Sequence, residues 1–336
     1  MDAHRARPLC RVCLMALALV LLFLLSFVWG RYDVPLGQVV RILLSRVFTV
    51  AQTWTDNMAI VVWNVRMPRI LLACLVGCAL SAAGYQTVFQ NPMAAPDILG
   101  ASSGACFGAA LAILTGQSSV MVTVFAFLSS LLTVVLVYLI GSHTRGNRVV
   151  SILLAGIMVG SLFSAGTSYI KLVADPSNQL PQITYWLMGS LSGTRMKTVG
   201  FAAVCMAVGL LPLLLLRWRM NLLTLSADEA RSMGVNTDRL RLVVILSATV
   251  LTAASVSVSG MIGWVGLVIP HLSRRLVGND CRYLLPMSMV FGAAFLLLVD
   301  NLARCLTAVE IPIGILTAFV GAPFFVYLMI KGDDRL

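Results

Sequence analysis

Charged side chains are scarce in this sequence. Asp, Glu, Lys and Arg make up 11% of the 336 residues, hydrophobic residues make up 59%, and the mean hydropathy is +0.94. A soluble fold cannot use that much apolar surface, because its exterior must be wetted by polar groups. The apolar residues instead form repeated runs of about 17–25, the length with which a helix crosses a bilayer. We therefore predict an all-α polytopic membrane protein, with residues 1–336 as a single transmembrane domain.

Acidic residues are the rarer charged class, 13 against 24 Lys and Arg. All of them fall in predicted loops or at the ends of predicted spans. A secondary transporter driven by an ion gradient usually holds ionisable groups in mid-membrane. The sequence therefore disfavours an ion-gradient-driven secondary transporter, which we keep as an alternative hypothesis for the function. The basic residues lie at the edges of apolar runs and not in one stripe, so they indicate membrane topology and not a nucleic-acid partner.

Motifs for catalysis, metal binding and disulfide formation are also lacking. The eight cysteines are scattered, and Cys10 and Cys13 form a lone C-x-x-C with no second pair. Neither His143 nor His271 has a second ligand at useful spacing. The only lysine followed by Ser or Thr is Lys197, and the residue before it is Met, whereas a phosphate-binding loop needs glycine there. We expect no enzyme, no metal and no cofactor bound by this chain.

Ten spans can be drawn through the apolar runs. They fall near 14–29, 67–88, 98–115, 120–140, 151–172, 198–216, 242–260, 261–276, 284–303 and 312–330. We expect the first span to be retained, because "SFVWGRYD" offers no small-residue cleavage site. Ten spans put both termini in the cytoplasm, with fifteen basic residues inside and nine outside, as the positive-inside rule favours. Residues 31–66 then form an external segment with amphipathic character.

One long polar stretch, "TLSADEARSMGVNTDRLR", covers residues 224–241. Ser226 suits an N-cap, and Glu229 three residues later completes a capping-box pattern. Gly234 is expected to end this helix, and Thr237 to begin a second short one that leads into the seventh span. One interpretation is a solvated loop. The other is a rigid pair of helices, residues 226–240, that another protein contacts, since short loops suffice between neighbouring spans.

A resemblance covers nearly the whole chain. "RMPRILLACLVGCALSAAGYQTVFQNPMAAPDILGASSGACFGA" resembles the FecCD-type permeases of bacterial ABC importers, which include the vitamin B12, haem and ferric-siderophore permeases. Further matches follow in the family's order: "YWLMGSLSG", "LSADEARSMGV", "GMIGWVGLVIPHLSR", "DNLAR" and "EIPIGILTAFVGAPFFVYL". The resemblance implies a fold like that of the vitamin B12 permease.

The resemblance also implies partners. A second permease subunit would complete a central pathway, as a homodimer by default because closed two-fold assemblies dominate, although a heterodimer also fits. Two cytoplasmic ATPase subunits would use ATP and Mg beneath it, and an extracytoplasmic binding protein would deliver the cargo. The chain would lie in the bacterial cytoplasmic (inner) membrane and move a ferric siderophore, or next haem or cobalamin, by alternating access.

Site residues carried over from the family fall into three groups. Coupling to the ATPase is expected at Ser226, Asp228, Glu229, Ala230, Arg231 and Gly234. Docking of the binding protein is expected at the external arginines Arg66, Arg69 and Arg304. A cytoplasmic gate is expected at Asn91 and Met93; the family usually has Leu at the position of Met93.

Each group has a plain structural alternative. The arginines could instead extend to the membrane surface, or Arg304 could pair with Asp300 one turn earlier. The segment around Asn91 could be only a tight turn between helices. The small-residue stretches "GASSGACFGAALA" and "AGIMVGSLFSAGTSY" are expected to pack helices closely more than to line a pathway.

Overall fold

The computed structural model describes residues 2–46, 48–49, 51–83, 96–144, 148–225 and 227–331. Throughout these ranges the regular structure is helical and no β-strand occurs, which confirms the all-α prediction. The long helices are α1 (Asp2–Leu25), α4 (Met67–Ala82), α7 (Ser119–His143), α8 (Arg148–Val173), α10 (Met196–Leu216), α12 (Thr237–Ser259), α14 (Cys281–Cys305) and α15 (Ile313–Lys331). Shorter elements are α2 (Leu36–Leu44), α3 (Asp56–Ile60), η1 (Val61–Arg66), η2 (Pro96–Leu99), α6 (Ala101–Leu114), α9 (Gln179–Leu187), η3 (Arg219–Thr224), α11 (Ala227–Ser232) and α13 (Val265–Val277).

Seven helices within the described residues are long and apolar enough to cross a membrane: Arg7–Leu25, Asp56–Ala82, Ser119–His143, Val150–Val173, Met196–Leu216, Thr237–Ser259 and Cys281–Cys305. Two shorter apolar helices, Ala101–Leu114 and Ile313–Tyr327, cover two more of the predicted ranges. The eighth predicted range holds α13, which has 13 residues and two arginines in its last turn. At 1.5 Å per residue α13 is about 20 Å long, shorter than the hydrocarbon core. The count of ten spans therefore stays a prediction.

The second spanning helix begins earlier than the sequence predicts. The motif "RMPR" suggests a start near residue 67, but α3 and the π-helical η1 continue without a break into α4. Pro68 lies near the start of α4, directly after the π-helical turn. A proline removes one backbone N–H, and the wider π-helical turn is a known way of fitting such a local defect into a helix. Residues 56–66, predicted as part of an external segment, thus extend a spanning helix.

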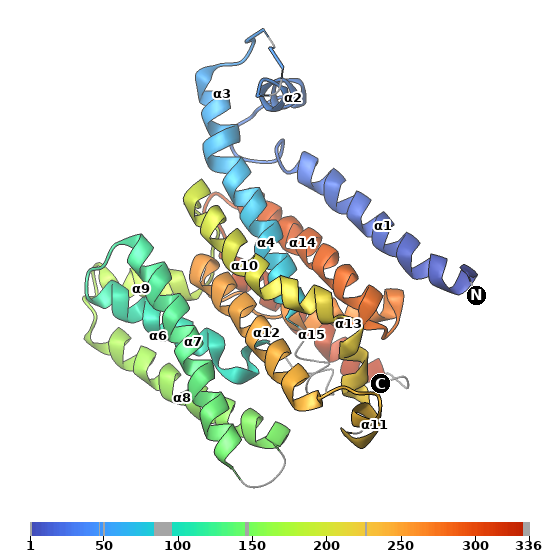
Figure 1. The fold of residues 1–336 in the computed structure, drawn as a ribbon. Helices are drawn as coiled ribbons and strands as arrows, with labels where there is room; N and C mark the ends of the chain where they lie inside the picture. Colours follow the sequence, from blue (N-terminus) through green and yellow to red (C-terminus); the bar gives the residue numbers. More distant parts are fainter. Residues whose placement is uncertain are drawn as a thin grey trace.

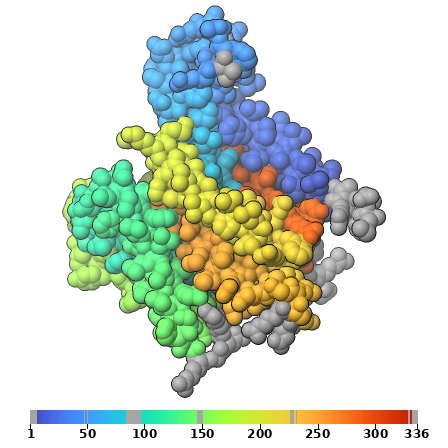
Figure 2. All heavy atoms as spheres, in the orientation of Figure 1, coloured from blue at the N-terminus to red at the C-terminus, as the bar shows by residue number. Residues whose placement is uncertain are grey.

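The ends of the molecule are distinct (Figure 1). In Figure 1, α2 and α3 lie beyond one end of the bundle and α11 lies at the opposite end. The helices α6, α7, α8 and α9 form a group on one side, and α1 runs along the other side of the bundle, against α14 and α13. Figure 2 shows the α2–α3 region protruding from the rest of the surface. The predicted external segment and the predicted cytoplasmic insert therefore lie on opposite ends, as they must if both assignments are correct.

Hydrogen bonds between distant segments define the same two ends. At one end Asn301 Nδ2 donates to Ser26 Oγ over 2.7 Å, which joins the end of α14 to the segment after α1. At the other end Asn221 Nδ2 donates to Asp280 Oδ1 over 2.8 Å, which joins η3 to the start of α14. Because α11 follows η3, we call this second end the inner end and the first the outer end, in line with the predicted topology.

Glycines set the closest helix contacts. A Cβ added at Gly77 of α4 would lie 2.2 Å from the carbonyl oxygen of Gly292 in α14. A Cβ added at Gly104 of α6 would lie 2.0 Å from the Thr133 hydroxyl of α7. Such contacts let backbones approach closely where lipid gives no hydrophobic force between helices. The predicted packing role of the small-residue stretches is confirmed at Gly104.

Candidate functional site

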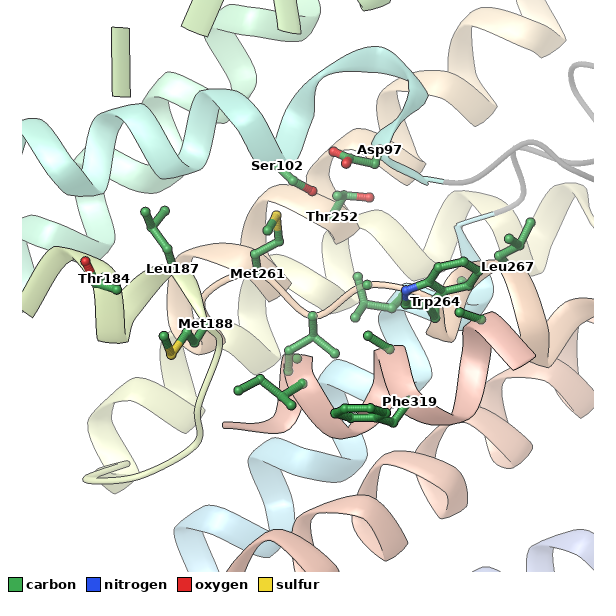
Figure 3. Close-up of a pocket in the computed structure, with 18 of the residues that line it drawn as sticks. Asp97, Ser102, Thr184, Leu187, Met188, Thr252, Met261, Trp264, Leu267 and Phe319 are labelled. Carbon is green, nitrogen blue, oxygen red and sulfur yellow. The ribbon is translucent and has the colours of Figure 1, made fainter. Parts of the chain in front are cut away.

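A cavity of about 920 Å³ lies beside α15 (Figure 3). It is lined by Leu80, Asp97, Ser102, Lys171, Thr184, Leu187, Met188, Thr252, Met261, Ile262, Gly263, Trp264, Gly266, Leu267, Gly314, Ile315, Ala318, Phe319, Ala322 and Pro323. Figure 3 shows Asp97 and Ser102, from η2 and the start of α6, across the pocket from Phe319 on α15. The wall is mainly apolar, with small side chains and methionines that hold no fixed hydrogen-bonding pattern. Such a wall suits a bulky solute that passes and is not tightly held.

One face of α15 forms much of this wall. Ile315, Ala318, Phe319 and Ala322 recur at helical spacing and all line the cavity. Phe319 also has an exposed fraction of 75%. A side chain that is both a wall residue and largely exposed shows that the cavity is open on this side. A single chain therefore builds only part of the enclosure.

Three loops meet at one edge of the cavity through glycines. Gly189 and Gly260 have φ values of +74° and +69°, which favour glycine, and a Cβ at Gly260 would lie 2.2 Å from the Trp186 carbonyl oxygen. A Cβ at Gly314 would lie 2.4 Å from the Met188 carbonyl oxygen. Two backbone hydrogen bonds join the loops: Ser190 N–H donates to the Ser259 carbonyl over 2.8 Å, and Ile313 N–H to the Gly189 carbonyl over 2.9 Å. We call this contact the glycine junction.

Trp264 is the non-glycine residue with positive φ among the described residues, at +69°. A left-handed backbone costs an L-residue about 1–2 kcal/mol, and for a bulky side chain it persists only where the surroundings enforce it. Here the Trp264 side chain packs directly on Gly321 of α15, where a Cβ would lie 2.5 Å from Trp264 Cβ. The glycine in α15 makes the space that this side chain occupies at the cavity wall.

Arg69 lies at the outer end of α4, where two carboxylates hold its guanidinium group. Its Nε donates to Asp300 Oδ1 over 2.9 Å, and its Nη1 contacts both carboxylate oxygens of Glu310 at 2.9 and 3.0 Å. Asp300 is fully buried, whereas the Glu310 side chain has an exposed fraction of 26%. Glu310 is thus the member of this cluster that water can reach.

Arg304 and Arg66 are also buried and also bound within the chain. Arg304 Nε lies 3.2 Å from Asp300 Oδ2 in an ion pair whose angles are not those of a hydrogen bond, and its Nη2 donates to Asn301. This confirms the predicted alternative of an internal Asp300–Arg304 pair. Arg66 donates to the backbone carbonyls of Phe27 and Tyr32. The three arginines predicted to dock a binding protein therefore share the outer end but do not extend to the surface, and their docking role stays a prediction.

The inner end carries the polar insert. The helix α11 is short, its Ala230 is fully buried, and its Glu229 is exposed. Gly234 has φ +76°, and Val235 N–H donates to the Ala230 carbonyl over 3.0 Å, so the predicted glycine stop is confirmed. Asn236 then caps α12 by accepting from Arg239 N–H. The predicted second short helix is wrong: α12 runs unbroken from Thr237 into the span, since no helix-breaking residue interrupts it.

Several predicted residues cannot be placed. Asn91 and Met93 of the predicted gate and Ser226 of the predicted cap lie outside the described residues, as do the side chains of Asp228 and Arg231. Within the described part of the chain, no group of three His, Cys, Asp or Glu side chains could hold a metal ion. Of the residues predicted to couple to the ATPase, the structure describes the side chains of Glu229 and Ala230 and the backbone of Gly234.

Sequence reasoning did not single out three residues that the structure brings forward. Glu310 lies in the quoted motif "EIPIG", but its contact with Arg69 joins residues 241 positions apart. Trp264 lies in the quoted "GMIGWVG", where the neighbouring glycines signal a turn but not which residue adopts positive φ. Lys171 lies in none of the quoted motifs, and its place in the cavity wall follows from the packing of α8 against α6.

Comparisons with known proteins all match this chain to transport permeases. A family model described as the FecCD transport family matches residues 18–331. The molybdate import permease MolB of Haemophilus influenzae is 40% identical over 94% of this chain and 94% of its own length. An iron chelatin transport permease of Helicobacter pylori is 40% identical, over 82% of this chain and 84% of its own. A cobalamin import permease of Halobacterium salinarum is 42% identical over 83% and 76%.

One solved structure is also closely similar. It is described as a metal-chelate type ABC transporter in an inward-facing conformation, and it superposes with a TM-score of 0.84 at 39% identity, covering 95% of this chain and 98% of its own. The overall fold described above is thus shared, over nearly its whole length, with a solved structure.

Proposed function

The chain belongs to the FecCD transport family of ABC transporter permeases, and on that premise we propose that it is the membrane subunit of an importer for a metal chelate. The observation that carries the proposal is the cavity of about 920 Å³ beside α15, mainly apolar and open on one side. Permease subunits of this family are not themselves enzymes. ATP hydrolysis would belong to a separate ATPase subunit.

We propose that the ATPase binds at the inner end through the insert of residues 226–240. A short helix that ends at a left-handed glycine is a compact and rigid projection. Its exposed polar face suits a cleft on another protein, and α12, which begins three residues after Gly234, would carry the movement into the bundle. Asp228, Glu229 and Arg231 supply the charges for that contact.

The open side of the cavity is where a second copy of the chain would complete the pathway. Phe319 of α15 is exposed there, and α8 presents a row of exposed apolar residues at helical spacing: Leu154, Ile157, Met158 and Leu162. A symmetric dimer would place two such walls around one space. The membrane would be the bacterial inner membrane, with both termini cytoplasmic, which the opposite positions of α2–α3 and α11 support.

The binding protein would approach the outer end. Arg66, Arg69 and Arg304 lie there, but their guanidinium groups are already bound within the chain. A carboxylate of the binding protein would reach Arg69 by displacing Glu310, which is partly exposed and contacts only the outer edge of the cluster. Docking through these arginines would thus be an exchange of ion pairs.

The cargo can be identified by reconstitution. The permease, its ATPase and its binding protein would be placed in liposomes and supplied with a ferric siderophore, haem, cobalamin or molybdate. We expect ATP-dependent uptake of a ferric siderophore, because the wall is wide and apolar, with few groups that could replace the hydration of a small oxyanion. Uptake of molybdate alone, as the relative MolB is named for, would contradict the chelate assignment.

A further inference from the structure

Lys171 stands out in the cavity wall. It lies in the last turn of α8 and is half-buried, while its neighbours Tyr169 and Leu172 are exposed by 66% and 80%. A lysine near the end of a spanning helix can extend its ammonium group to the membrane surface, whereas an ionisable residue that faces a cavity marks a pathway for polar or charged solutes. Here the apolar neighbours take the outward positions, and Lys171 lines the cavity.

The ammonium group of Lys171 has no ion pair with any carboxylate in the described part of the chain. Asp175, one turn further on, would be the natural partner at i+4 spacing. Its Oδ1 instead accepts a hydrogen bond from Ser177 N–H over 3.3 Å. Lys171 thus presents a positive charge to a mainly apolar space, where charges act over longer distances than in bulk water.

Asp97 is the other titratable residue of the wall, and it lies toward the inner end. Its short helix η2 contacts α8 at Gly156, where a Cβ would lie 2.2 Å from the Ile98 carbonyl oxygen. About 22 Å of helix separates Gly156 from Lys171. The cavity therefore has a positive charge at its outer end and a negative charge deeper in. An anion would be attracted on entry and repelled near Asp97, which lets a transported solute leave again.

Resting on the proposed function, we propose that Lys171 makes this pathway selective for anionic cargo, and that the transported chelate carries a net negative charge on carboxylate or phenolate oxygens. Lysine acts as a point charge with three donors, which suits varied oxygen positions on the periphery of a chelate. Molybdate shares this negative charge, whereas cobalamin and neutral chelates do not, so the cargo classes separate by charge.

The test is equilibrium dialysis of radioiron probes against the permease–ATPase complex in lipid nanodiscs. One probe is iron(III) tris-catecholate, with three negative charges, and the other is neutral iron(III) tris-acetohydroxamate; radioactive molybdate is a third. The variant is Lys171→Met, which keeps the length of the side chain without its charge, and Lys171→Arg restores a charge. The matched control is Lys197→Met, a lysine in the first turn of α10 that is exposed and outside the cavity wall.

We expect Lys171→Met to weaken tris-catecholate binding about tenfold or more, since a hydrogen bond to a charged group contributes on that order. Binding of the neutral probe should not change, Lys171→Arg and Lys197→Met should resemble the wild type, and added salt should shrink the effect. If Lys171→Met also weakens molybdate binding, Lys171 selects anions by charge alone. If molybdate does not bind to the wild type while the catecholate does, the site is assigned to chelates.

Equal binding of the anionic probe by wild type and Lys171→Met would overturn the proposal. So would loss of both iron probes alike, or an equal effect of Lys197→Met. ATP-driven uptake by the wild-type complex is measured in parallel, with the cargo that the liposome reconstitution identifies. If uptake proceeds while Lys171 has no effect on anion binding, the charge selectivity fails and the importer function stands.

Discussion

Asp300 connects the two buried arginines at the outer end of the bundle. Its carboxylate contacts Arg69 through one oxygen and Arg304 through the other, and it is fully buried. A buried ion pair contributes little relative to an apolar core, but removing one partner leaves an uncompensated charge in a low-dielectric site. Glu310 contacts the same Arg69 from a position that water reaches, so its loss can be offset by solvent.

We therefore expect Asp300→Asn to lower the free energy of unfolding by about 3 kcal/mol or more. Glu310→Gln should lower it by about 1 kcal/mol or less, because water screens a partly exposed pair. Thermal unfolding of the two variants in one detergent gives the comparison. An Asp300→Asn protein as stable as the wild type, or less affected than Glu310→Gln, would show that the cluster does not hold the outer end together.

The helix pair α4 and α14 depends on glycine where the two axes come closest. Gly77 and Gly292 face each other, and Gly292 would meet the Ser81 hydroxyl as well as the Gly77 carbonyl if it carried a Cβ. The Arg69–Asp300 ion pair joins the same two helices nearer the outer end. The close approach and the ion pair therefore fix the same two helices at two heights.

Gly77→Ala should destabilise the protein by about 1–3 kcal/mol, because the added methyl forces the two backbones apart. Gly200→Ala is the matched control: Gly200 lies inside α10, and nothing lies within 4 Å of the position of an added Cβ. There the higher helix propensity of alanine should leave stability unchanged or raise it by up to about 1 kcal/mol. Thermal unfolding in the same detergent checks both, and equal effects of the two changes would contradict the packing account.

Sequence patterns predict the helical elements well, because long apolar runs and their basic flanks follow from membrane physics alone. The stop at Gly234 was predictable for a similar reason, since only local backbone chemistry decides it. The early start of the second span could not be predicted, because a π-helical turn before Pro68 has no distinct sequence pattern. The pairing of Arg69 with Glu310 and the inward position of Lys171 were also out of reach, since both depend on how distant helices pack.

For the molecule as a whole, the two ends carry different groups. The outer end has a buried charge cluster and the glycine junction at the cavity edge, and the inner end has a short polar insert before α12. In our account a separate ATPase moves the insert, and α12 transmits that movement to the cavity wall, to which it contributes Thr252. The chain itself would then be unable to drive transport.

The most direct test of this account is uptake of radioiron chelate into liposomes that contain the permease and binding protein, with and without the ATPase subunit. Uptake should require both the ATPase and Mg-ATP on the cytoplasmic side. A permease with Asp228→Ala, Glu229→Ala and Arg231→Ala together should lose transport about tenfold or more while its thermal unfolding is unchanged. Accumulation of the chelate by the permease alone under a proton gradient, or full uptake by the triple variant, would contradict it.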